Sequence, residues 1–266
     1  MELARSLPGV RVALAVHPNE AVLHAGVREV GPDGLEPAAA PHHDEPVDAA
    51  MARLGGADPV GLARLEATIR ECRDVVVSVG ESGLDYFRTG ERGRQVQREA
   101  FRAHIALAKE LGLALQIHDR DAHEDCVQVL LADGAPERTV FHCFSGGAEL
   151  ARACAEHGWD ASGAGPVTYP ANEELRSALA LVPSELLLVE TDAPYLPPKA
   201  WRGRPNASYL MGDTVRFLAA SREVDEAALC QMLARNTEAV YGRWRAAPSG
   251  QVRGGGVERR RSSSMW

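Results

Sequence analysis

Residues 75–87 read VVVSVGESGLDYF, a valine-rich run that ends at Gly80 and is followed at once by Glu81. Short apolar runs of this kind recur along the chain, each ending in polar residues and followed by a segment with apolar residues at helical spacing. This alternation is typical of βα units and a parallel sheet. The sequence predicts six strands, at residues 11–16, 75–80, 113–117, 139–141, 159–162 and 186–190.

Helices are predicted between and after these strands. Residues 96–111 have apolar residues at helical spacing and stop at Gly112, a favourable C-cap. The other predicted helices are residues 122–131, 148–157, 172–181, 209–220 and 226–241.

The same pattern predicts the domain organisation. Residues 1–245 are interpreted as one barrel domain, because 266 residues with 45% apolar content suffice for one. Residues 31–59, rich in proline, glycine and alanine, are interpreted mostly as a surface insertion. Residues 246–266 have too few apolar residues for a core and are predicted to be a disordered tail.

The composition narrows the class of protein. No stretch approaches the roughly eighteen consecutive apolar residues of a membrane span, and the N-terminal segment is not a signal peptide. The five cysteines form no CxxC pair, which argues against disulfides and fits a reducing cytosol, so we expect a soluble cytoplasmic protein. The net charge of −8 does not suit a protein that wraps nucleic acid, so any phosphate substrate must be held locally.

Residues of catalytic type directly follow the predicted strands. His17 follows VALAV, Glu81 follows VVVSVG, His118 follows LALQI, His142 follows TVF and Asp192 follows LLLVET. The C-terminal ends of the strands of a parallel barrel all lie on one face, where active sites are built. These five groups are therefore expected together at that face, the mouth of the barrel. Two carboxylates with two or more histidines suit a two-metal hydrolytic centre.

Each of these residues also has a structural explanation. A single histidine after a strand is usually hydrogen-bonded within the fold, and a single carboxylate there often caps a helix or pairs with a cation. Their joint occurrence at strand ends favours a functional site. Periodicity by itself does not name the reaction.

Six longer segments resemble the TatD family of metal-dependent hydrolases, from about residue 11 to residue 244. In the order of the family they are VALAVHPNEA, VGESGLDYF, LQIHDRDAHEDC, VFHCFSGGAELA, GPVTYPANEELR and LLLVETDAPYLPP. The resemblance implies a TIM-type (β/α)8 barrel of the metal-dependent hydrolase kind. It also implies a deoxyribonuclease that hydrolyses phosphodiester bonds as a 3′–5′ exonuclease, with two divalent cations, either magnesium, manganese or zinc.

The resemblance assigns the metal ligands. Glu81 would bridge two metal ions, and His118 and His142 would bind one of them. Asp192 would bind the other ion or orient the attacking water. Glu81 and Asp192 are therefore the expected catalytic residues.

The resemblance also implies residues that line the site. His17 and Arg120 are expected to contact the substrate phosphate, although a solvated charge at the start of a helix is the alternative for Arg120. Ser145 matches a position that lines the site. Asp85 and Tyr86 lie in the motif of Glu81 and are interpreted as residues that cap or pack the loop.

The sequence departs from the family pattern at its start. The family begins with a strand that carries a His-x-His pair for the first metal, and these 266 residues contain no His-x-His. His42 and His43 are adjacent and are interpreted as loop residues. A barrel of eight strands needs two more than the six predicted, so we expect the chain to lack the first two strands. The natural protein would then carry roughly 50 to 70 further residues, at about 25 to 35 per βα unit.

A second departure lies in residues 201–210, WRGRPNASYL, where Ala207 and Ser208 stand in place of the Glu-Pro that the family often has. This change affects a possible glutamate contact and leaves the expected metal ligands intact.

Two alternatives to a phosphodiesterase stay open from the sequence. The first is a barrel with the same metals that hydrolyses an amide or an ester. The presence of Arg120 and His17 favours a phosphate substrate over this alternative. The second is a truncated, catalytically impaired fragment or a binding module, which the missing His-x-His supports. The expected partner is DNA or another phosphodiester, with neither a membrane nor an obligate protein partner.

Overall fold

The computed structural model describes residues 1–35 and 61–243, which contain one parallel sheet with the strand order β1-β2-β3-β4-β5-β6. All five strand pairs are parallel. The strands are β1 (Val12–Ala13), β2 (Val76–Asp85), β3 (Ala114–Arg120), β4 (Thr139–Phe141), β5 (Asp160–Gly163) and β6 (Leu187–Val189). The six predicted strands are therefore confirmed. His42, His43, most of the predicted insertion and the predicted tail lie outside the described residues.

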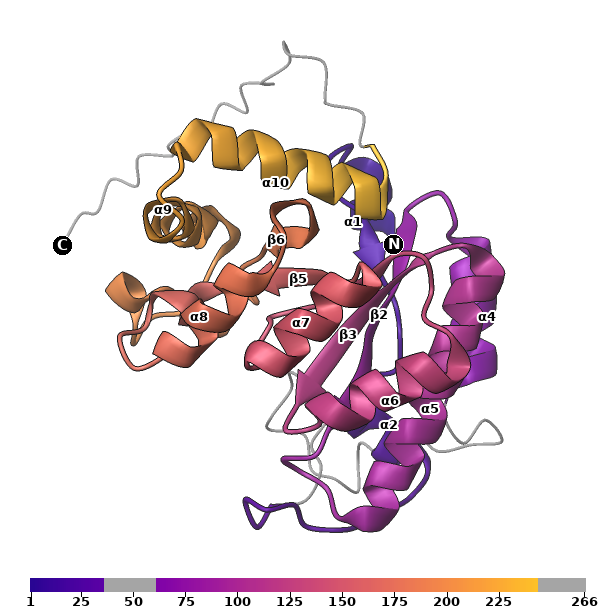
Figure 1. Cartoon of the computed structure of the whole chain (residues 1–266). Helices are drawn as coiled ribbons and strands as arrows, with labels where there is room; N and C mark the ends of the chain where they lie inside the picture. The colour runs from indigo at the N-terminus through magenta and orange to yellow at the C-terminus, as the bar shows by residue number, and fades with distance from the viewer. Residues whose placement is uncertain (36–60, 244–266) are drawn as a thin grey trace, which may run out of the picture.

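Helices follow the strands along the chain, and α10 lies across one end of the curved sheet (Figure 1). The helices are α1 (Glu2–Ser6), α2 (Pro18–His24), α4 (Leu62–Glu71), α5 (Glu91–Leu111), α6 (His123–Asp133), α7 (Ala148–His157), α8 (Glu173–Leu181), α9 (Met211–Ser221) and α10 (Glu226–Tyr241). Four short 3-10 helices are η1 (Gly165–Thr168), η2 (Ser184–Leu186), η3 (Lys199–Trp201) and η4 (Ser208–Leu210). The six predicted helices are confirmed, whereas α1, α2 and α4 are not among them. None of the described helices has the length and apolar character needed to cross a membrane.

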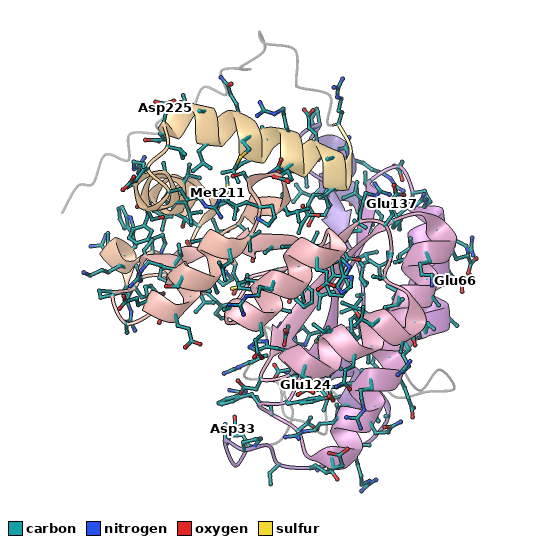
Figure 2. The ribbon with its side chains drawn as sticks, in the orientation of Figure 1. Asp33, Glu66, Glu124, Glu137, Met211 and Asp225 are labelled. Atoms are coloured by element: carbon teal, nitrogen blue, oxygen red, sulfur yellow. The ribbon has the colours of Figure 1, made fainter. Side chains whose placement is uncertain are left out.

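The core lies between the helices and the sheet. Phe101 and Ile105 of α5 are buried in a cluster that also contains Leu115 of β3. Their spacing gives α5 one apolar face, which packs on β2. Charged side chains such as Glu66 of α4 and Glu124 of α6 point outward (Figure 2).

Strands β2 and β3 are longer than predicted, which corrects the position of three site residues. Glu81 and His118 lie inside these strands rather than after them, and Arg120 ends β3 instead of starting a helix. Val79 pairs with Leu115 and Ser82 with Ile117, so β2 has one residue more than β3 between the two pairs. The extra residue makes a β-bulge at Glu81, and such bulges change the direction of nearby side chains.

Two packing features hold the bulge in place. Gly83 has a φ of 130°, and a Cβ at this position would lie 2.1 Å from the carbonyl oxygen of His118. Glycine is therefore required for the close approach of β2 and β3. His104 of α5, 1% exposed, accepts a hydrogen bond from the backbone N–H of Val16 at Nε2 (3.2 Å), and its Nδ1 lies 2.8 Å from Oγ of Ser82. One imidazole thus joins α5 to the residues that flank His17 and Glu81.

The buried ring of His104 predicts a pH-dependent stability. Burial lowers the pKa of His104 to about 4, from 6.5 in the unfolded chain. Because the unfolded chain binds the proton more readily between these values, the stabilisation is complete above pH 6.5 and is lost as the pH falls toward 4. Between pH 7.5 and pH 5 the free energy of unfolding of the wild type should fall by about 2 kcal/mol more than that of His104→Gln.

Urea denaturation at the two pH values measures this difference. His157→Gln is the matched control, because His157 is exposed at the end of α7. The same pH dependence in His104→Gln and in the wild type would contradict the role assigned to His104.

Candidate metal centre

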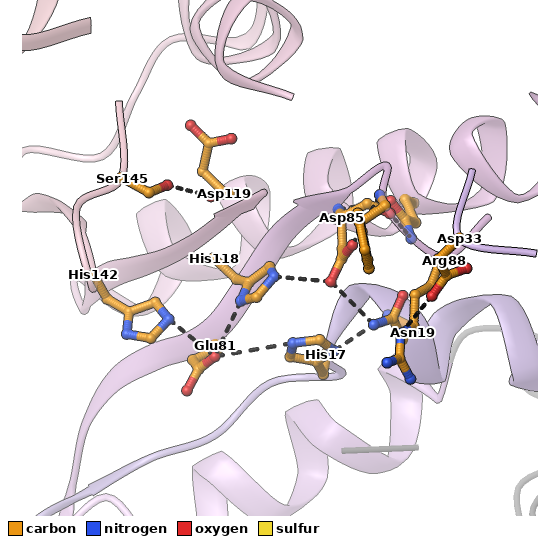
Figure 3. A network of polar contacts seen from close by, with 12 residues as sticks. His17, Asn19, Asp33, Glu81, Asp85, Arg88, His118, Asp119, His142 and Ser145 are labelled. Atoms are coloured by element: carbon orange, nitrogen blue, oxygen red, sulfur yellow. Dashed lines mark hydrogen bonds and ion pairs between the residues drawn. The ribbon is translucent and has the colours of Figure 1, made fainter. Parts of the chain in front are cut away.

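Three histidines point at one carboxylate oxygen, Oε2 of Glu81 (Figure 3). Nε2 of His142 lies 3.1 Å from this oxygen, Nδ1 of His118 3.5 Å and Nε2 of His17 3.9 Å. The three rings come from three places in the sheet: His118 lies in β3, His142 follows β4 and His17 is the N-cap of α2 after β1. The predicted meeting of these residues at the C-terminal ends of the strands is confirmed.

The protonation of Glu81 and His17 follows from these contacts. Burial raises the pKa of the Glu81 carboxyl, but hydrogen bonds from His118 and His142 outweigh it and hold this pKa well below its usual range. Burial lowers the pKa of His17 to about 3. At neutral pH, Glu81 is therefore an anion and His17 a neutral ring.

Two carboxylates fix the orientation of the other two histidines. Oδ2 of Asp85 lies 3.2 Å from Nε2 of His118, and Oε1 of Glu190 lies 3.0 Å from Nδ1 of His142. A carboxylate accepts one ring N–H of each histidine, so Nδ1 of His118 and Nε2 of His142 are the nitrogens that face Glu81.

Burial by itself would lower the pKa of both rings. Asp85 and Glu81 outweigh this effect for His118, and Glu190 does so for His142, so both pKa values are raised. A cation bound between these rings and Glu81 would displace their second proton.

The tautomer of His17 is different. Its Nδ1 accepts a hydrogen bond from the backbone N–H of Asn19 at 3.2 Å. The neutral ring therefore carries its proton on Nε2, the atom that faces Glu81, and this N–H is a hydrogen-bond donor.

Asp192 joins the site from the loop after β6, where its φ of 53° is in the left-handed region. Burial raises the pKa of its carboxyl to about 6, although His142 opposes the shift. Non-glycine residues in this conformation cluster at functional sites.

The donor atoms fit divalent cations. Two groups of three residues place their donor atoms within 4.8 Å of one another: His17, Glu81 and His118, and Glu81, His142 and Asp192. Glu81 belongs to both groups, and imidazole nitrogen with carboxylate oxygen is a donor set that zinc and manganese accept.

Other predicted site residues lie around this centre. The guanidinium of Arg120 lies over the ring of Phe87, 3.8 Å from its centroid, and its charge contributes to lowering the pKa of Asp85. Oγ of Ser145 donates to the carbonyl oxygen of Asp119 at 3.1 Å.

Asp85 and Tyr86 both make side-chain contacts beyond their own loop. Asp85 accepts a hydrogen bond from the N–H of Phe87 (3.1 Å), which confirms its predicted capping role, and it also contacts His118. The hydroxyl of Tyr86 lies 2.5 Å from Asp125 of α6, so Tyr86 packs between helices.

Sequence reasoning missed Glu190 and the contact of Asp85 with His118. Glu190 ends the apolar run LLLV of β6, two residues before Asp192. An acidic residue at the end of a buried strand is seldom tolerated without a partner, and this signal points to Glu190.

Comparisons with known proteins agree with this geometry. The family model described as TatD related DNase matches residues 1–242. An uncharacterized metal-dependent hydrolase TatD of Mycobacterium tuberculosis is 45% identical over 186 residues, which cover 68% of this chain and 69% of that protein. The 3′-5′ ssDNA/RNA exonuclease TatD of Erwinia amylovora is 34% identical and is matched over 68% of this chain and 72% of that protein. The chain spans about two thirds of the length of the curated relatives it matches.

A solved structure shows the same architecture. YjjV, a TatD homologue from Escherichia coli, superposes with a TM-score of 0.72 at 25% identity, over 91% of this chain and 80% of that one. The expected fold class, a TIM-type β/α barrel of the metal-dependent hydrolase kind, is thereby confirmed. The match of the family model over most of the chain shows that this protein belongs to the TatD related DNase family of metal-dependent hydrolases.

Proposed function

We propose that this chain hydrolyses phosphodiester bonds with the help of divalent cations and acts on DNA as a 3′–5′ exonuclease. The observation that carries the proposal is the convergence of Nδ1 of His118 and Nε2 of His142 on the Glu81 carboxylate. The name of the Erwinia amylovora relative, an ssDNA/RNA exonuclease, supports a nucleic-acid substrate.

The proposed ligands are those expected from the family. Glu81 would be shared by two cations, His118 and His142 would hold one of them, and Asp192 would hold the other or orient the attacking water. The sharing of Glu81 by both groups of donor atoms supports its bridging role, whereas these groups place His142 with Asp192 and His118 with His17. When bound, the cations make water acidic enough to attack at neutral pH and neutralise charge on the phosphate.

His17 and Arg120 are the proposed phosphate contacts. The proton on Nε2 of His17 supports this role over metal ligation, because Nδ1 already accepts the N–H of Asn19 and a cation at Nε2 would have to displace the only proton of this neutral ring. Arg120 presents a permanent positive charge at the end of the strand that holds His118. The imidazole of His17 and the guanidinium of Arg120 can both donate hydrogen bonds to phosphate oxygens. An amide or ester substrate has no phosphate oxygens.

The carboxyl of Asp192 is suited to move a proton. A general base works best when its pKa lies near the operating pH, and the pKa of this buried carboxyl is raised to about 6. We infer that Oδ of Asp192 accepts the proton of the attacking water, while Glu81 remains charged.

One assay separates this proposal from its alternatives. The purified chain is supplied with Mn²⁺ and incubated, in separate reactions, with a 3′-labelled single-stranded DNA, with bis(p-nitrophenyl) phosphate, and with simple ester and amide substrates. Metal-dependent loss of nucleotides from the 3′ end supports the proposal. Cleavage of the ester or amide alone favours the second enzyme class, and metal binding without any cleavage favours a binding module.

Replacement of Glu81 tests the shared ligand. Glu81→Gln removes the charge that both groups of donor atoms use, so hydrolysis of bis(p-nitrophenyl) phosphate should fall by more than about a hundredfold, with weaker Mn²⁺ binding in calorimetry. Glu137→Gln is the control, because Glu137 is exposed before β4. Wild-type metal affinity in Glu81→Gln would refute the ligand assignment.

Replacement of Glu190 tests the orientation of His142. Glu190→Gln keeps the size of the side chain but removes the carboxylate that holds the N–H of His142, so the affinity for Zn²⁺ should fall about 10- to 100-fold. Calorimetric titration measures this change, with the exposed Glu185→Gln as the matched control. An unchanged affinity would mean that packing alone orients the ring.

A further inference from the structure

Asn19 makes two hydrogen bonds toward the candidate metal centre, one from its backbone and one from its side chain (Figure 3). Its backbone N–H donates to Nδ1 of His17 at 3.2 Å. Its side-chain Nδ2 donates to Oδ2 of Asp85 at 3.1 Å, and the same carboxylate oxygen lies 3.2 Å from Nε2 of His118. One residue therefore reaches two of the three rings that face Glu81.

The start of α2 fixes the position of Asn19. His17 is the N-cap of this helix, and Pro18 occupies its first position, where the fixed φ of proline suits a helix start. The helix packs on α5 and β2, and its Val22 is fully buried. Asn19 itself is 6% exposed, so its amide is held among protein groups and is directed at Asp85.

The carboxylate of Asp85 is held at both of its oxygens. The backbone N–H of Phe87 donates to Oδ1 at 3.1 Å, and Asn19 donates to Oδ2. Gln97 of α5, fully buried, holds the backbone of Asp85 instead, through its N–H at 2.9 Å and its carbonyl oxygen at 3.0 Å. Gln97 thus sets where the backbone lies, whereas the direction of the oxygen that faces His118 depends on Asn19.

The other end of the Asn19 amide has no partner. Its Oδ1 is buried and accepts no hydrogen bond from any residue that the structure describes. The carboxylate of Asp85 settles the orientation of the amide, because only the nitrogen end can donate to it. A buried acceptor without a donor lowers the stability of a fold, and such groups are rare. The amide therefore serves the neighbouring centre at some cost to stability, which is typical of functional sites.

We propose that Asn19 is a positioning residue that fixes the rings of His17 and His118 together. Its backbone N–H keeps the proton of His17 on Nε2. Its side chain acts through Asp85, which keeps an N–H of His118 at Nε2 and directs Nδ1 of that ring at Glu81. The two rings meet edge to face with their centroids 4.5 Å apart, and both point at Oε2 of Glu81. The inference rests on the proposed function and adds a residue that prepares the centre for a cation and a phosphate.

The variant Asn19→Leu tests this role. Leucine is close in size to asparagine and keeps the backbone N–H, but it cannot donate to Asp85. The affinity for Zn²⁺, measured by calorimetry, should fall about tenfold. In NMR spectra of the metal-free protein, the N–H at Nε2 of His118 should exchange faster with water, because its acceptor is no longer held. The ring resonances of His17 should stay unchanged, because the backbone donor remains.

Thermal unfolding separates this role from a structural one. The unfolding midpoint of Asn19→Leu should stay close to that of the wild type, because the substitution also removes the unpaired Oδ1. Asn19→Ala, which removes the amide without adding bulk, should change Zn²⁺ affinity and exchange at His118 in the same direction. A purely structural amide would lower the unfolding midpoint and leave the exchange at His118 unchanged.

Asn172→Leu is the matched control. Asn172 is half-buried at the start of α8 and donates one hydrogen bond from Nδ2, also at 3.1 Å, to the carbonyl oxygen of Pro166. Its replacement should leave the Zn²⁺ affinity and the exchange at His118 at their wild-type values.

Wild-type exchange at His118 in both Asn19 variants would overturn the positioning role. Hydrolysis of bis(p-nitrophenyl) phosphate by the wild type and by Asn172→Leu, with Mn²⁺ supplied, tests the proposed function separately. If neither protein hydrolyses it, the phosphodiesterase proposal fails, whereas the exchange measured in the metal-free protein still decides the role of Asn19.

Discussion

The contact of three imidazole rings with one oxygen of Glu81 is the constraint on which the rest of the structure depends. Three buried imidazole rings lie this close together because the anionic Glu81 stands between them and the ring of His17 is neutral. Asp85 and Glu190 balance the charge of His118 and His142 by accepting the opposite ring N–H. The site therefore consists of a carboxylate, its ring partners and a second layer of carboxylates that fixes their tautomers.

The sheet provides the positions that this arrangement needs. Strands in sequential parallel order bring their C-terminal ends side by side, and the β-bulge of β2 directs Glu81 toward its neighbours. Gly83 allows the approach of β3, and His104 holds the backbone on both sides of the site from α5. The precision of the centre thus comes from strands and from a helix packed on them, which are more rigid than loops.

Most of the strands and helices could be predicted from the sequence, because hydrophobic periodicity shows which segments are buried. The helices α7 and α10 begin and end at the predicted residues, and the strand-end rule placed the histidines and Glu81 at one mouth. Helix α2 escaped prediction because its N-cap is His17, outside the usual capping residues, and α4 begins after Gly61 without a side-chain cap. The contacts of Asp85 and Glu190 depend on side-chain direction, which a bulge and strand length alter and which periodicity does not record.

The distribution of charge limits how this acidic chain can hold a polyanion. With a net charge of −8 there is no long-range attraction, so binding must come from contacts near the reacting bond. Arg120 lies at the end of β3, and Lys199, Arg202 and Arg204 lie in the segment after Asp192. Under the proposed function, a phosphodiester substrate would be held by these few cations near the reacting bond, and its binding would weaken steeply with salt because it depends on short-range charge contacts.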